Sequence, residues 1–268
     1  MGSGPFGLAF DGASVWVANS NSNNVSKLQA NDGTVLGTFA VGSSPTEIAF
    51  DGANIWVTNE ASNNVTELRA SDGSVLGTFG VGMQPYGVAF DGASLWVANS
   101  GSGTVTKLRA LDGKVLGTFA VGMHPLGVAS DGLNIWVANS QSNTVTKLRA
   151  RDGVVLGTFG VGSFPACVAF DGANLWVTNE DSNNVTELRA IDGSVLGTFN
   201  VGTFPFGVAF DGANVWVTNN GARTVTKLQA SDGKVLGTFT VGSDVRGLLF
   251  DGASVWVANA GSNTVSKL

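Results

Sequence analysis

Phe10-Asp11-Gly12-Ala13-Ser14-Val15-Trp16-Val17-Ala18-Asn19 decides the fold, because close copies of this segment recur along the whole chain. Its tryptophan stands at positions 16, 56, 96, 136, 176, 216 and 256, so the period is 40 residues without insertion or deletion. A second block, Asp-Gly-x-Val-Leu-Gly-Thr-Phe, begins at Asp32, Asp72, Asp112, Asp152, Asp192 and Asp232. A strict period of this length predicts a repeat architecture in which each repeat forms one supersecondary unit.

Each repeat contains four short runs that are rich in β-branched and aromatic residues. In the first repeat the runs cover about residues 6–10, 14–19, 25–29 and 35–41, separated by Asp-Gly pairs or Asn/Ser clusters. Such spacing is typical of antiparallel hairpins. Proline stands just before the first run, where no ladder N–H is needed, at Pro5, Pro45, Pro85, Pro125, Pro165 and Pro205. Four strands per repeat predict the blades of a β-propeller.

The predicted fold is all-β, a single seven-bladed propeller domain over residues 1–268. The blades cover about residues 1–40, 41–80, 81–120, 121–160, 161–200, 201–240 and 241–268. One tryptophan per repeat fits a side chain packed between neighbouring blades. An open superhelical stack of the same repeats is the alternative.

The seventh blade is predicted to have three strands, because its repeat contains no fourth run. The ring then closes by blade packing alone, or a closing strand has been trimmed from the chain, or another chain donates that strand. We expect a monomer, with strand exchange through the incomplete blade as the other outcome.

The repeats resemble the NHL/YVTN type of β-propeller. The naming motif of the latter is nearly present in Trp56-Val57-Thr58-Asn59, with tryptophan where that family has tyrosine, and it recurs at residues 176–179 and 216–219. The opening Pro-x-Gly-Val-Ala-Phe-Asp, as in residues 85–91, is similar to the start of an NHL-like blade. The resemblance implies that the Gly-Val-Ala-Phe run is the innermost strand of each blade and the Val-Leu-Gly-Thr-Phe run the outermost. It implies little about activity, because one fold hosts many functions.

Sequence differences between the repeats are concentrated on one predicted face of the disc, here called the variable face. It carries the blade-to-blade connections and the turns between second and third strands. Variable loops on a rigid scaffold are where binding usually occurs, and these connections should surround the mouth of the central channel. The predicted ligand-binding residues are Phe6, Glu47, Tyr86, His124, Phe164, Phe204, Phe206, Asp244 and Arg246. Packing of these side chains on the neighbouring blade is the alternative interpretation.

Catalytic groups are scarce in the sequence. The single histidine, His124, and the single cysteine, Cys167, could face each other as a pair, but nothing else marks a nucleophile site. Virginiamycin B lyase-like propellers, which this chain resembles in fold, rely on several histidines and a glutamate with a divalent metal. We predict no catalytic residue, no metal and no cofactor. A weak cation candidate is the ring of Asp11, Asp51, Asp91, Asp131, Asp171, Asp211 and Asp251, whose alternative role is to stabilise Asp-Gly turns.

The net charge of −6 argues against a nucleic-acid partner or an anionic membrane surface. No signal peptide or transmembrane segment is recognisable, and the compartment stays open. The leading hypothesis is a non-enzymatic scaffold that binds a small molecule, glycan or peptide on the variable face. Residues 41–80 and 161–200 differ at only 8 positions, which favours a structural or engineered repeat protein without a ligand as the alternative. A metal-assisted lyase or hydrolase is the third hypothesis.

Overall fold

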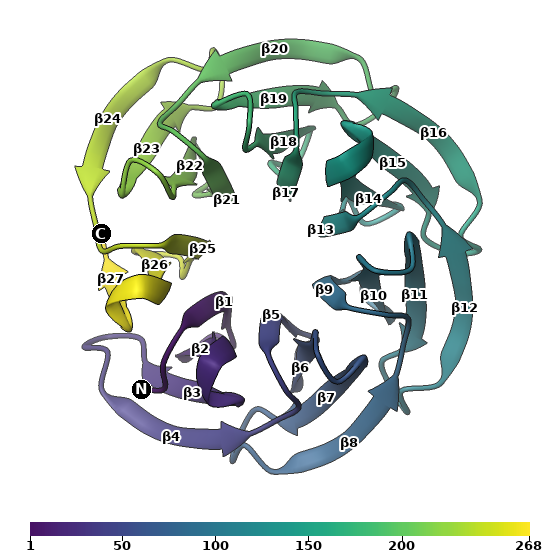
Figure 1. Ribbon diagram of the computed structural model, residues 1–268, viewed down its shortest axis with the longest axis vertical. Coiled ribbons are helices and arrows are strands. Elements are labelled where there is room, and N and C mark those ends of the chain that lie inside the picture. The colour runs from purple at the N-terminus through teal and green to yellow at the C-terminus, as the bar shows by residue number, and fades with distance from the viewer.

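All 268 residues are described by a computed structural model, which shows a closed ring of seven β-sheets (Figure 1). Six sheets have four antiparallel strands, and the seventh has three. The predicted seven-bladed propeller with an incomplete last blade is therefore confirmed, and the open superhelix is wrong. Each blade radiates outward from a central channel.

The strands of each blade follow one another from the channel to the rim, in chain order. The innermost strands are β1 (Pro5–Phe10), β5 (Pro45–Phe50), β9 (Pro85–Phe90), β13 (Pro125–Ser130), β17 (Pro165–Phe170), β21 (Pro205–Phe210) and β25 (Val245–Phe250). The second strands are β2 (Ser14–Asn19), β6 (Asn54–Asn59), β10 (Ser94–Asn99), β14 (Asn134–Asn139), β18 (Asn174–Asn179), β22 (Asn214–Asn219) and β26 (Val255–Asn259).

The outer half of each blade completes the sheet. The third strands are β3 (Asn24–Gln29), β7 (Asn64–Arg69), β11 (Thr104–Arg109), β15 (Thr144–Arg149), β19 (Asn184–Arg189), β23 (Thr224–Gln229) and β27 (Thr264–Lys267). The outermost strands are β4 (Val35–Ala40), β8 (Val75–Gly80), β12 (Val115–Ala120), β16 (Val155–Gly160), β20 (Val195–Asn200) and β24 (Val235–Thr240). In the first blade the strand ends lie within one residue of the expected bounds. Each proline was expected just before its strand, whereas in the structure it is the first residue of that strand.

Tryptophan side chains join each blade to the next. Trp16 is fully buried and packs with Ile55, Val57 and Leu68 of the second blade. Its indole N–H donates to Asp11 Oδ2 at 2.8 Å, so its one polar atom is satisfied inside the interface. Equivalent indole-to-aspartate bonds occur in all seven blades. The repeated sequence thus builds repeated apolar interfaces with repeated polar anchors.

Lysines on the third strands add a second contact between blades. The Lys147 ammonium lies 4.8 Å from the centre of the Trp136 ring and donates to the Ala190 carbonyl of the next blade at 2.7 Å. Stacking on an aromatic face and a charge-assisted hydrogen bond both stabilise this position. Comparable lysine-to-carbonyl bonds are made by Lys27, Lys107 and Lys267.

The ring closes within one chain, by packing of the seventh blade on the first. Trp256 packs in one cluster with Leu8, Val15 and Val17. Lys267 donates to the Ala30 carbonyl at 2.7 Å, and the Gly4 N–H donates to Asn263 Oδ1 at 2.8 Å. These contacts join the seventh blade to the first, as closure by blade packing predicts.

Helical structure is limited to three single turns on the variable face. They are η1 (Ser20–Ser22), η2 (Ser140–Ser142) and η3 (Ala260–Ser262). No helix has the length and apolar character needed to cross a bilayer.

Candidate functional site

Every innermost strand has a register irregularity, and in the first, third, sixth and seventh blades it places a large side chain at the channel mouth. In the first blade, Pro5 pairs with Asn19 and Leu8 pairs with Val17, so residues 6 and 7 lie outside the ladder. The same irregularity follows the first residue of all the other innermost strands. Bulges of this kind re-aim side chains. We call the first of the two bulged positions the mouth position; it holds Phe6, Thr46, Tyr86, Leu126, Ala166, Phe206 and Arg246.

The second bulged position is glycine in five blades, because the next blade lies too close for a side chain. A Cβ on Gly87 would meet the Leu126 carbonyl oxygen at 2.2 Å, and one on Gly247 would meet the Phe6 carbonyl oxygen at 2.6 Å. The second and fifth blades break the pattern with Glu47 and Cys167. In both blades the residue at the mouth position, Thr46 or Ala166, is small. The side chain that points into the channel is then Glu47 or Cys167.

Three aromatic rings from three different blades meet at the mouth positions. Phe6 makes edge-to-face contacts with Tyr86 and with Phe206, each with ring centroids 5.6 Å apart and planes at 88°. The Arg246 guanidinium lies 5.3 Å from the centres of both the Phe6 and Phe206 rings. These four predicted residues are brought together, and we call them the aromatic cluster. Because they lie 40 to 240 residues apart, the ring itself assembles them.

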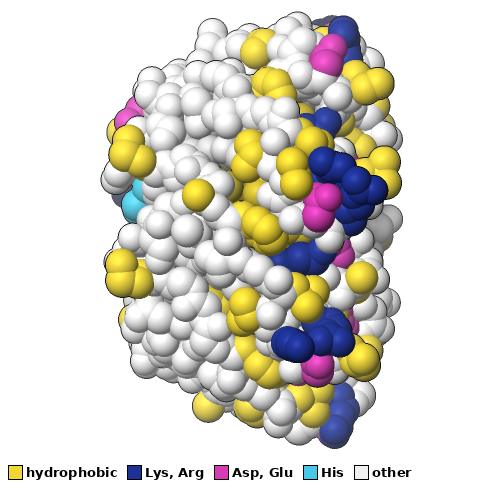
Figure 2. Space-filling model, turned by 90° about the vertical axis from the view of Figure 1, so that its right-hand side faces the viewer, with side chains coloured by type: hydrophobic (Ala, Val, Ile, Leu, Met, Phe, Trp, Pro, Cys, Tyr) yellow, Lys and Arg dark blue, Asp and Glu magenta, His cyan; other side chains and the backbone are white.

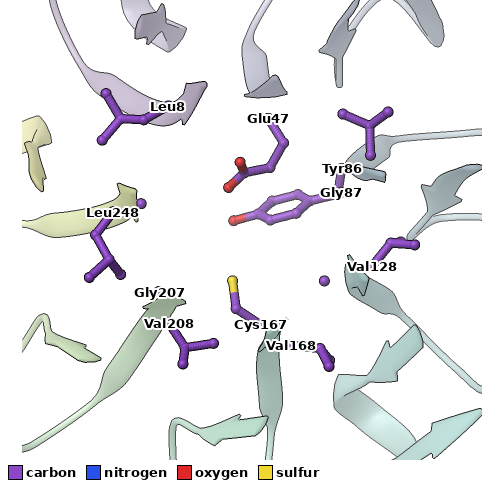
Figure 3. A pocket seen from close by; sticks show the side chains of 13 residues that line it. Leu8, Glu47, Tyr86, Gly87, Val128, Cys167, Val168, Gly207, Val208 and Leu248 are labelled. Carbon is purple, nitrogen blue, oxygen red and sulfur yellow. The ribbon is translucent and has the colours of Figure 1, made fainter. Parts of the chain in front are cut away.

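A cavity of about 110 Å³ occupies the channel beside this cluster. Its wall is mostly apolar and includes Leu8, Val128 and Leu248. Figure 3 shows the Glu47 carboxyl, the Tyr86 hydroxyl and the Cys167 thiol all directed into it, from three different blades. These are the polar side chains of the cavity wall.

Burial sets the protonation of all three polar groups. Desolvation raises the pKa of Glu47 from 4.5 to about 8, although a hydrogen bond from the Ile48 backbone opposes it. Desolvation also raises the pKa of Cys167 well above its usual value, and the Glu47 and Glu180 carboxylates add to the effect. The pKa of Tyr86 rises for the same first reason. At neutral pH the cavity therefore presents a carboxylic acid, a phenol and a thiol rather than three anions.

The other predicted residues lie one position before the innermost strands. His124, Phe164, Phe204 and Asp244 all have left-handed backbone conformations, with φ between 50° and 53°. His124 Nδ1 is 2.9 Å from Ser140 Oγ, and its ring centroid lies 6.4 Å from that of Phe164. Phe204 is half exposed. Asp244 pairs with Arg246 at 2.8 Å and so connects this outer layer to the aromatic cluster.

His124 and Cys167 are not paired. The imidazole bonds Ser140 in the outer layer, whereas the thiol faces the cavity. The raised pKa of the thiol also keeps it protonated, which is the opposite of an activated nucleophile. His124 and Cys167 therefore do not form the Cys–His pair that the sequence allowed.

Two carboxylates at the mouth were missed by sequence reasoning. Glu60 and Glu180 directly follow the second strands of their blades and are half-buried. Desolvation raises the pKa of both, while His124 lowers that of Glu60 and Arg246 lowers that of Glu180. The signal was present in the repeats, since this position reads Ser20, Glu60, Ser100, Ser140, Glu180, Asn220 and Ala260.

Charges are distributed unevenly between the two faces. Figure 2 shows lysine and arginine gathered toward one face, with the histidine on the opposite, variable face. The variable loops and the channel hold the acidic residues Glu47, Glu60, Glu180, Asp181 and Asp244. Their basic residues are Arg223 and Arg246. A hollow of about 270 Å³ opens between the first and seventh blades, lined in part by Phe6, Asp244 and Arg246.

The aspartates of the predicted cation ring are bound within their own blades. Asp131 Oδ1 accepts the backbone N–H groups of Leu133 at 2.9 Å and Asn134 at 2.6 Å, and Oδ2 accepts the Trp136 indole N–H at 2.8 Å. Burial alone would raise its pKa, but these hydrogen bonds outweigh burial and lower it. No group of three or more His, Cys, Asp or Glu side chains is placed to hold a metal ion.

Comparisons with known proteins find likeness in structure only. No family model and no curated protein sequence matches the chain. A solved structure of Kuenenia stuttgartiensis hydrazine synthase matches with a TM-score of 0.87 at 20% identity, covering 99% of this chain and 95% of that one. A streptogramin B lyase structure matches with a TM-score of 0.82 at 20% identity, covering 99% and 93%. Catalytically inactive virginiamycin B lyase from Staphylococcus aureus, solved with quinupristin, matches at 0.86 and 19% identity, covering 99% and 94%. The chain is thus similar over its whole length to these propellers, and its fold is that of a seven-bladed β-propeller, as the NHL/YVTN-type repeat predicted.

Proposed function

We propose that this chain is a non-enzymatic binding propeller that takes a small, positively charged ligand at the channel mouth. An amine or the amino terminus of a peptide has suitable chemistry. The observation that carries the proposal is the aromatic cluster. Within a ring of near-identical blades, side chains from the first, third, sixth and seventh blades build one surface that is not repeated. A single site of this kind is what one ligand requires.

The charge of the mouth supports a cation. Glu60 and Glu180 are half-buried carboxylates with raised pKa values, so a positive charge beside them would offset their desolvation. Rings of the aromatic cluster can hold a cation over their faces. Arg246 provides a precedent within the chain, since its guanidinium already lies over two of those rings.

Binding is favoured over catalysis by the state of the reactive groups. The Cys167 thiol has a raised pKa. The Ser140 hydroxyl next to the His124 imidazole donates its proton to the His124 carbonyl, so the imidazole is not placed as its base. The lyase activity named for two structural neighbours belongs to proteins about 20% identical to this chain. That likeness supports a common fold and no shared chemistry.

A ligand panel tests the proposal. Calorimetry and thermal shift would compare primary amines, a quaternary ammonium, a dipeptide with a free amino terminus, carboxylates and neutral sugars. We expect saturable binding of the amines that weakens at high salt. The double variant Glu60→Gln/Glu180→Gln should lose about tenfold in amine affinity, because the charges go while the side-chain shapes stay.

The matched control uses the same two blades. Glu67 and Glu187 also have pKa values raised by desolvation, but they lie on third strands, away from the mouth. Glu67→Gln/Glu187→Gln should leave amine binding unchanged. Preferential binding of carboxylates or sugars would contradict the charge argument. No binding by any member of the panel would favour a structural repeat protein without a ligand.

A further inference from the structure

Glu47 is the only acidic residue in the wall of the channel cavity. It stands at the second bulged position, which is glycine in five of the other six blades. Its carboxyl lies against the first blade, since a Cβ on Gly7 would meet Glu47 Oε2 at 2.6 Å. A glycine in one blade therefore leaves the space that the carboxyl of the next blade occupies.

No cation of the chain neutralises this carboxyl. None of the ion pairs includes Glu47, and no basic side chain contributes to its pKa. Its hydrogen-bond donor is the Ile48 backbone N–H. The Arg246 guanidinium is engaged by Asp244 at 2.8 Å. Because an unpaired charge is costly to bury, a cation brought by a ligand would stabilise the ionised form of Glu47.

The groups beside Glu47 offer hydrogen bonds without a charge. The Tyr86 hydroxyl from β9 and the Cys167 thiol from β17 are directed into the same cavity (Figure 3). Burial holds the pKa of both well above neutral, so both keep their protons. A phenol oxygen can accept a hydrogen bond while its O–H donates one. The charged side chains whose fields act on Tyr86 and Cys167 are Glu47, Glu60, Glu180 and Arg246.

The space beside these groups suits a short alkyl chain. The cavity of about 110 Å³ has apolar walls that include Leu8, Val128 and Leu248. Since a group the size of a water molecule takes about 30 Å³, the cavity has room for about four non-hydrogen atoms, such as a nitrogen with a propyl chain. A primary amine of this size can place its carbons against the leucine and valine side chains while its nitrogen reaches the carboxyl.

We propose that the channel cavity binds the ammonium group of a short primary alkylamine, with the Glu47 carboxylate as its counter-ion; this rests on the proposed function and names the ligand class. The ammonium donates to the Glu47 carboxylate and to the Tyr86 hydroxyl oxygen. The alkyl chain packs on the apolar wall, where its burial adds to the affinity.

Binding in this form releases a proton. Desolvation raises the pKa of Glu47 to about 8, so at pH 6 to 7 the free protein holds the carboxyl protonated. The free amine is an ammonium at the same pH. The bound ammonium–carboxylate pair contains one acidic proton fewer than the separate partners, and that proton passes to the buffer. Affinity should therefore rise about tenfold per pH unit below the pKa of Glu47 and level off above it.

The test is calorimetry with n-propylamine and the full chain, repeated in buffers with different ionisation enthalpies to count the protons released. We expect close to one proton per ligand at pH 6 and at pH 7. Affinity should increase about 50-fold between pH 6 and pH 8, as a Glu47 pKa of about 8 requires. Tetramethylammonium should bind at least about tenfold more weakly, because it has no N–H to donate to Glu47 or Tyr86.

Protein variants locate the site. Glu47→Gln keeps the shape of the side chain, and it should lower the affinity for propylamine at pH 8 by at least about 30-fold and release no proton. Glu47→Gly gives this blade the residue that five others have, and it should lose affinity to the same extent. The matched control is Glu67→Gln in the same blade, on β7, where desolvation also raises the pKa. It should bind like wild type.

The outcomes separate this site from the mouth. Absence of amine binding would overturn the channel site together with the proposed function. Binding that releases no proton, or that Glu47→Gln leaves unchanged, would overturn the channel site alone, because the amine would then lie at Glu60 and Glu180. A loss of affinity in Glu47→Gln without a loss in Glu60→Gln/Glu180→Gln would support the channel site and remove the mouth carboxylates from the proposed function.

Discussion

At the scale of single residues, the aspartate before each turn does more than its sequence context indicates. The Asp-Gly pair predicts a turn, and the turn is present, with the aspartate accepting two backbone N–H groups. The bond from the tryptophan indole to the same carboxylate was not predicted. It connects residues five positions apart and ties the turn to the buried interface between blades.

Asp131→Asn should therefore destabilise the fold. An amide nitrogen would face at least one of the N–H groups that donate to this carboxylate and leave it unsatisfied, at a cost of about 1–3 kcal/mol in the free energy of unfolding. Urea unfolding followed by tryptophan fluorescence measures this change. The control is Asp152→Asn in the exposed outer turn of the same blade, where we expect a much smaller loss of stability. Equal losses for the two variants would contradict a special role for the buried carboxylate.

Glu47 should make stability fall as pH rises. Its pKa is about 8 in the folded protein and near 4.5 unfolded, so between these values the folded state holds the extra proton. The free energy of unfolding should decrease across this window and level off above it. The channel is open enough for water to screen the charge, so we expect a total loss of roughly 2–4 kcal/mol.

Glu47→Gln separates this effect from other titrations. The variant should be more stable than wild type at pH 8 and about equal at pH 4, with a flatter pH profile in denaturant unfolding. Residual slope is expected from Glu60 and Glu180, whose pKa values are also raised by desolvation. An unchanged profile in the variant would show that Glu47 is charged in the folded protein.

At the scale of elements, the blades are joined by two kinds of junction. Six junctions have both a chain connection and side-chain contacts, whereas the seventh, between β27 and β3, has side-chain contacts alone. Lys267 contributes to that junction through its bond to the Ala30 carbonyl and its position over Trp256. The lysine contact should therefore contribute a larger share of the stability of this junction than of the others.

Lys267→Met should loosen the seventh blade locally. The methionine keeps apolar contact with Trp256 but loses the ammonium group, so hydrogen exchange should become faster in β25 to β27 and in β1. Lys147→Met is the matched change at a junction with a chain connection. It should lower global stability by about 1 kcal/mol without selective exchange in one blade. Uniform exchange in both variants would mean that the seventh junction is no weaker than the rest.

At the scale of the whole molecule, the sequence predicted the architecture well because every determinant is local and repeated. The 40-residue period, the Asp-Gly turns and the short runs of β-branched and aromatic residues act within one blade, and the copies agree. The three-stranded seventh blade was predictable for the same reason, because its repeat lacks the Val-Leu-Gly-Thr-Phe motif of the fourth strand. Closure of the ring was left open, because it depends on contacts between Lys267 and Ala30, 237 residues apart.

The candidate site was predictable only in part. The choice of face and of Phe6, Tyr86, Phe206 and Arg246 followed from variation between repeats, and these four side chains meet. The contacts among the three rings run between non-adjacent blades, which no local pattern encodes. Glu60 and Glu180 went unnoticed because they directly follow the strands rather than standing in the loop centres. Ligand binding by all of these residues stays a prediction.

The bonds from Gly4 to Asn263 and from Lys267 to Ala30 bring the two ends of the chain together at one edge of the disc. A short linker could therefore join head to tail, and new ends could be cut at any of the six inter-blade loops without removing a contact. Such permuted chains would move the break in the backbone away from the open blade. In an engineered permutant, the chain ends would lie at a different junction from the three-stranded blade.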